Sequence, residues 1–107
     1  MKAQNEFVLS KQVLKSGTSI GANVEEATAA QTKKDFASKM AIASKEARET
    51  HYWLRLISES KMVHYDLKSI LGDCDDLINI LTAIVKTTQL RLASQNRSTD
   101  GTRALYT

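Results

Sequence analysis

The sequence predicts an all-α protein, and three observations lead to that prediction. The chain of 107 residues contains no proline and only four glycines, so the residues that most often interrupt helices are scarce. Apolar residues recur at steps of three and four through most of the chain, as they do on one face of an α-helix. A chain of this length forms one domain with a modest core. We therefore expect an antiparallel up-down helical bundle of the four-helix-bundle type.

The first predicted helix covers residues 6–30, with Asn5 as its N-cap. Gly17 stands on the apolar stripe of this helix, and Gly21 lies one turn after it. A glycine inside a helix costs about 1 kcal/mol relative to alanine, so a pair of them calls for a physical reason. We interpret the pair as a place where another helix packs closely, either within the chain or across a subunit interface.

The second predicted helix covers residues 33–60, and Thr32 is expected to cap it. Asp35 follows Thr32 at the third position, which nearly matches the capping box. Its core stripe has helical spacing and consists of Phe36, Met40, Ala43, Ala47, Thr50, Leu54 and Ile57.

The third predicted helix covers residues 66–92, with Asp66 as its N-cap. It carries two adjacent apolar stripes, a width that fits a helix buried against two or more neighbours. The stripes consist of Ile70, Cys74, Leu77, Leu81, Ile84 and Thr88, and of Leu71, Ile78, Val85 and Leu92. The bundle is thus expected over residues 1–92, and the polar, aperiodic residues 93–107 are predicted to form a disordered tail.

Composition limits the classes of function. The formal net charge of +3 permits a nucleic-acid partner without requiring one. Cys74 is the only cysteine, so an intrachain disulfide is excluded. The N-terminus lacks the apolar stretch of a signal peptide, and no run approaches the roughly 20 apolar residues that span a bilayer. We expect a cytoplasmic protein with no membrane partner.

The spacing of titratable residues argues against catalysis and metal binding. Carboxylate-bridged metal bundles use Glu-x-x-His, but Arg48 stands three residues before His51 and Lys61 three before His64. The acidic run from Asp73 to Asp76 lacks the spacing and the closing Glu of a calcium loop, and Cys74 is expected to face the core. We expect no enzyme, no metal site and no cofactor.

Basic residues are the remaining candidates for binding, and they are proposed to contact phosphates of RNA or DNA. Solvated lysines on any helix look similar, so a plain surface role explains them equally well. Tyr52 and Trp53 are assigned to core or subunit contacts, because an aromatic pair beside Leu54 at helical spacing most often packs. The proposed phosphate contacts are Lys11, Lys15, Lys33, Lys34, Lys39, Arg48 and Arg55.

Five segments together resemble the four helix bundle protein family, also called the 23S rRNA-intervening-sequence proteins. They are residues 6–12 (EFVLSKQ), 16–27 (SGTSIGANVEEA), 33–36 (KKDF), 45–56 (KEARETHYWLRL) and 81–87 (LTAIVKT), and the resemblance extends over about residues 6–89. It implies a small bacterial four-helix bundle that forms ring-like pentamers, some encoded within 23S rRNA genes. A related branch is the accessory variability protein of diversity-generating retroelements, which binds nucleic acid and a reverse transcriptase.

The chain departs from that family in one respect, because the family's usual first helix is expected before residue 6 and is missing here. Three helices with wide apolar stripes would leave an apolar groove. We expect another subunit to fill it, in a dimer as an alternative to the family's pentamer, unless the true start of the protein lies upstream.

Two functions follow from the sequence. The first is a non-enzymatic accessory protein whose homo-oligomer gathers weak basic patches into one nucleic-acid-binding surface. The alternative is an oligomeric scaffold that binds a protein partner through the exposed groove.

Overall fold

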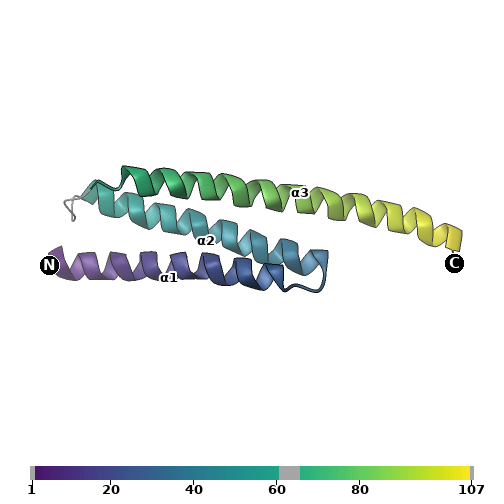
Figure 1. The fold of residues 1–107 in the computed structure, drawn as a ribbon, viewed down its shortest axis with the longest axis horizontal. Coiled ribbons are helices and arrows are strands. Elements are labelled where there is room, and N and C mark those ends of the chain that lie inside the picture. Colours follow the sequence, from purple (N-terminus) through teal and green to yellow (C-terminus); the bar gives the residue numbers. More distant parts are fainter. Residues whose placement is uncertain (1, 61–65, 107) are drawn as a thin grey trace.

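Three long helices make up the computed structural model, which describes residues 2–60 and 66–106, with side chains placed for residues 7–60 and 66–95. The helices are α1 (Lys2–Thr28), α2 (Lys33–Ser60) and α3 (Lys68–Tyr106), and the described part of the chain contains no strand. Figure 1 shows α2 running back beside α1, and α3 following along the other side of α2. The prediction of an all-α chain with three long helices is confirmed.

The molecule is a rod. Its extents are 67 × 20 × 17 Å and its radius of gyration is 18.7 Å, whereas a compact domain of this length has a radius of about 13 Å. At 1.5 Å per residue, the 39 residues of α3 span about 58 Å and account for most of the long axis. Figure 1 shows the C-terminal part of α3 running past the end of the α1–α2 hairpin.

The helix α2 is the centre of the arrangement, because it packs against both other helices. Within the described residues, no Cα atom of α1 lies within 8 Å of a Cα atom of α3. The structure therefore leaves one side open between α1 and α3, and this open side positions the candidate site.

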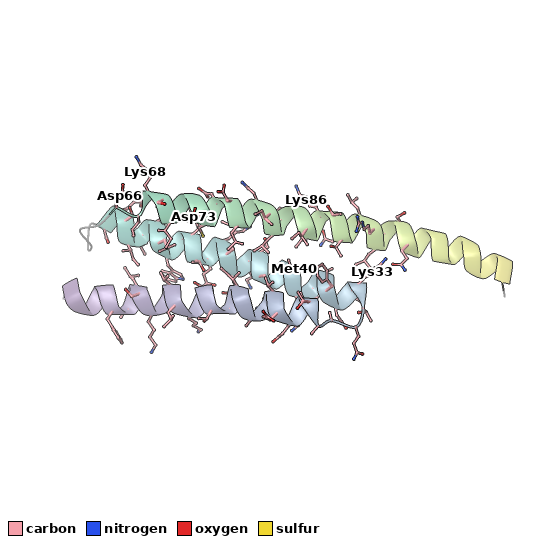
Figure 2. All side chains as sticks on the ribbon, viewed as in Figure 1. Lys33, Met40, Asp66, Lys68, Asp73 and Lys86 are labelled. Carbon is pink, nitrogen blue, oxygen red and sulfur yellow. The ribbon has the colours of Figure 1, made fainter. Side chains whose placement is uncertain are left out.

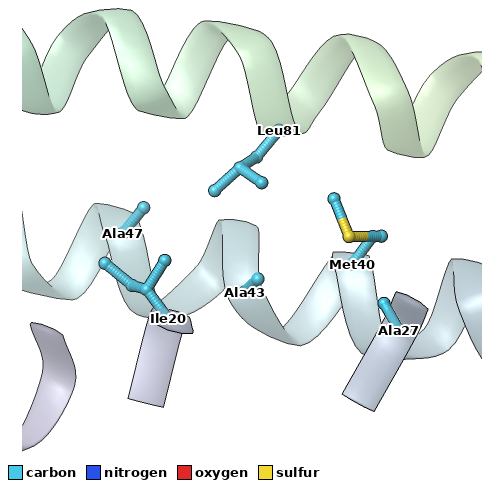
Figure 3. Close-up of a cluster of buried hydrophobic side chains, with 6 residues drawn as sticks. All are labelled: Ile20, Ala27, Met40, Ala43, Ala47 and Leu81. Atoms are coloured by element: carbon cyan, nitrogen blue, oxygen red, sulfur yellow. The ribbon is translucent and has the colours of Figure 1, made fainter. Parts of the chain in front are cut away.

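The core is a narrow cluster at which all three helices meet (Figure 3). Ala43 and Ala47 of α2 are 0% exposed and stand between Ile20 of α1 and Leu81 of α3. Alanine at these two positions lets both neighbouring helices approach the backbone of α2 closely. The cluster is completed by Ala27 and Met40.

Two helix starts follow from local chemistry, as predicted. The Thr32 hydroxyl oxygen accepts a 3.0 Å hydrogen bond from the Asp35 N–H, and a carboxylate oxygen of Asp66 accepts a 2.9 Å bond from the Lys68 N–H. Each bond satisfies an N–H that the first turn of a helix leaves without a partner. Figure 2 shows Asp66 and Lys68 at the start of α3 and Lys33 at the start of α2.

The helix ends differ from the sequence-based bounds by more than two residues in two places. The first helix begins at Lys2, so Asn5 lies inside α1 and is not its N-cap. Lysine, alanine, glutamine and glutamate all favour helix, so nothing in residues 2–6 stops the helix from extending. The third helix continues to Tyr106, through the residues expected to form a disordered tail, because this stretch contains no proline and a single glycine.

A buried pair of hydroxyl groups ties α1 to α2. Ser16 is 2% exposed and Thr50 is 8% exposed. The Thr50 hydroxyl donates to Ser16 Oγ at 2.8 Å, and the Ser16 hydroxyl donates to the Gln12 carbonyl at 2.9 Å. The pair fixes the register of the two helices, because sliding either one by a turn would separate the hydroxyls.

Candidate functional site

The open side of the molecule holds an apolar groove of about 240 Å³. Side chains from all three helices line it, and all but two of the nine lining residues are apolar or glycine. The lining consists of Val13, Gly17 and Ile20 from α1, Thr50 and Leu54 from α2, and Ile70, Asp73, Cys74 and Leu77 from α3. The floor is the face of α2 that lies between its two neighbouring helices.

Large apolar side chains remain exposed on the helices beside this groove. Ile70 on its α3 wall is 48% exposed, and Phe7 and Leu14 on α1 are 67% and 66% exposed. Phe7 and Leu14 lie seven residues apart and line a second hollow on α1 with Ser10 and Lys11. Soluble monomers rarely expose contiguous apolar surface of more than a few hundred Å², so these side chains mark a surface suited to contact with another molecule.

The single cysteine lies in the groove wall. Cys74 is buried, as predicted, and its thiol donates to the Ala47 carbonyl across the α2–α3 contact at 3.5 Å. Burial in this apolar wall raises the pKa of the Cys74 thiol, and the neighbouring Asp75 carboxylate raises it further. The thiol therefore stays protonated at neutral pH and behaves as a small apolar group.

Polar contacts hold α3 against α2 on the side of α2 away from α1. His51 Nε2 lies 3.1 Å from an Asp75 carboxylate oxygen, and an Arg48 guanidinium nitrogen donates to the Thr82 hydroxyl at 3.0 Å. Arg48, proposed as a phosphate contact, thus lies in an exposed bond between two helices. His51 is partly buried in this contact, whereas His64 lies outside the described residues.

The seven basic candidates do not form one patch. Lys39 pairs with Glu26 at 2.6 Å, and Arg55 lies 3.8 Å from Glu59 on its own helix, so two of the positive charges are offset locally. Lys11 and Lys15 are exposed on α1, whereas Lys33 and Lys34 are exposed at the other end of the hairpin. From Lys11 to the end of α1 at Thr28 is about 26 Å along the helix, so the two lysine pairs lie far apart.

The two glycines of α1 face open space. A Cβ atom built on Gly17 or Gly21 would meet no described atom within 4 Å, apart from the helix's own backbone. Close packing against a helix of the same chain therefore does not explain the pair. The other sequence-based interpretation, contact with a second subunit, stays a prediction, and Gly17 lies in the groove wall where such contact would occur.

The aromatic pair on α2 consists of Tyr52 and Trp53, which lie outside the groove. Tyr52 is 47% exposed, and its ring meets that of Trp53 edge to face with centroids 4.9 Å apart. The Trp53 indole N–H donates to a Glu49 carboxylate oxygen at 3.3 Å. Neither residue lines the groove. Their assignment to a subunit contact stays a prediction, and it concerns a surface other than the groove.

In the part of the chain that the structure describes, no three His, Cys, Asp or Glu side chains gather as a metal site. Among the same residues, no helix combines the length and the apolar character needed to cross a membrane.

The fold and the groove define the class of protein: an elongated all-α rod built from three helices, with one apolar side left open. A family model described as "23S rRNA-intervening sequence protein" matches residues 1–83. The chain belongs to this family, and the resemblance drawn from its sequence segments is confirmed.

A solved structure supports the same assignment. It is the crystal structure of a protein of unknown function from the S23 ribosomal protein family of Bacteroides thetaiotaomicron. The two chains are 48% identical, the match covers 78% of each, and the TM-score is 0.72. Among curated proteins, none is a match to this chain.

Proposed function

We propose that this protein is a non-enzymatic helical scaffold that acts as an oligomer and takes up one further helix in its groove. The observation that carries the proposal is the groove itself, with its apolar walls from all three helices. A helix laid between α1 and α3 would contact both of them and complete a four-helix bundle. This proposal develops the alternative reached from the sequence, an oligomeric scaffold that binds a protein partner through the groove, and the scatter of the basic residues supports it over nucleic-acid binding.

The gain from filling the groove is sizeable. Burial of apolar surface contributes about 25 cal/mol per Å², so each 100 Å² of exposed wall that a helix covers would contribute about 2.5 kcal/mol before the cost of association. A substitution at Ile70 should affect the binding of a helix in the groove, because this side chain lies in the groove wall and 48% of its surface is exposed in the single chain.

The proposal is tested by the molar mass in solution, measured by size-exclusion chromatography with light scattering. We expect the native protein to have a mass that is a multiple of 11.9 kDa. Ile70→Lys places an ammonium group in the groove and is expected to shift the mass to that of a monomer.

Leu90→Lys is the matched control, because Leu90 is 71% exposed on α3 and does not line the groove. It should leave the mass unchanged. A native protein that remains a monomer up to millimolar concentration would contradict the scaffold.

Binding of nucleic acid is the second candidate function. Lys11, Lys15, Lys33 and Lys34 are exposed and lie outside the groove, so an assembled oligomer would keep these charges on its surface. The description of the family, which refers to intervening sequences of 23S rRNA, gives this candidate its context. An oligomer multiplies the net charge of +3 and strengthens a field that one chain produces weakly.

Fluorescence anisotropy with a structured RNA and a DNA duplex tests this candidate. Binding should weaken linearly in a log-log plot against salt, and reversing all four lysines to glutamate should abolish it. A matched control reverses Lys39 and Arg55, whose charges are already offset by Glu26 and Glu59. The absence of binding to either nucleic acid at low salt would exclude this function and leave the scaffold unaffected.

A further inference from the structure

We draw no further inference here: the strongest candidate, the hollow of about 330 Å³ that Phe36 of α2 forms with Ile84, Thr88 and Arg91 of α3, exposes mainly apolar surface, and nothing in the part of the chain that the structure describes shows what covers it.

Discussion

The buried hydroxyl pair between α1 and α2 gives a prediction whose size follows from the geometry. Ser16→Ala leaves the Thr50 hydroxyl with another acceptor, the Glu46 carbonyl at 2.8 Å, and Thr50→Val leaves the Ser16 hydroxyl donating to Gln12. Neither variant strands a buried donor. Each should therefore lower the free energy of unfolding by about 1 kcal/mol, the net contribution of one hydrogen bond.

The double variant distinguishes this account from independent effects. Because both variants remove the same 2.8 Å bond, the double variant should also cost about 1 kcal/mol, where independent effects would give about 2 kcal/mol. The coupling energy is thus about 1 kcal/mol. Urea unfolding followed by circular dichroism measures the free energy of unfolding of the native protein, the two single variants and the double variant. Equal m-values show that the unfolded states are comparable.

The control for this cycle is Thr18→Ala, because the Thr18 hydroxyl is exposed and bonds only to carbonyls of its own helix. It should cost less than about 0.5 kcal/mol. Additive losses for Ser16→Ala and Thr50→Val, within about 0.3 kcal/mol, would refute the claim that this bond couples α1 to α2.

Three further outcomes are expected. Ala47→Leu should lower the free energy of unfolding, measured in urea, by about 1–3 kcal/mol, because Ala47 of α2 is 0% exposed and lies between α1 and α3. An unchanged free energy would contradict the close packing. The raised pKa of Cys74 means that the folded state retains the thiol proton longer than the unfolded state does, so stability should fall as the pH rises above about 8.5. The free energy of unfolding of Cys74→Ser should fall less than that of the native protein between about pH 8 and pH 10. Parallel plots of the two free energies against pH would exclude the thiol as the cause. Deleting residues 96–107 should change the unfolding free energy by less than about 0.5 kcal/mol, because that part of α3 runs past the hairpin (Figure 1), and a larger loss would show that it packs.

The helices and two of their starts could be predicted because they depend on neighbours in sequence. The spacing of apolar residues identifies the buried face, and Thr32 and Asp66 cap helices through bonds that span two or three residues. The start of α1 lies four residues before the predicted one, because a helix without a breaker continues past a residue that favours caps. The width of the apolar stripe on the third helix also predicted that α3 has more apolar surface than α2 alone can cover.

The rest depends on how the helices are placed in space, which spacing along one helix does not specify. The bond between Ser16 and Thr50 and the pairing of Lys39 with Glu26 both require a register between α1 and α2. Phe7 and Leu14 lie off the main apolar stripe of the first helix, so they form a second exposed apolar face only when α2 covers that stripe.

The most direct test of the central claim uses the native cysteine, because Cys74 lies in the groove wall. The rate of its modification by 5,5′-dithiobis(2-nitrobenzoic acid) is measured as protein concentration rises from nanomolar to high micromolar, with urea-unfolded protein as the reference. If another copy fills the groove, the rate per molecule should fall at least about 10-fold across the range, with a midpoint at the dissociation constant. A rate that does not depend on protein concentration would contradict the account.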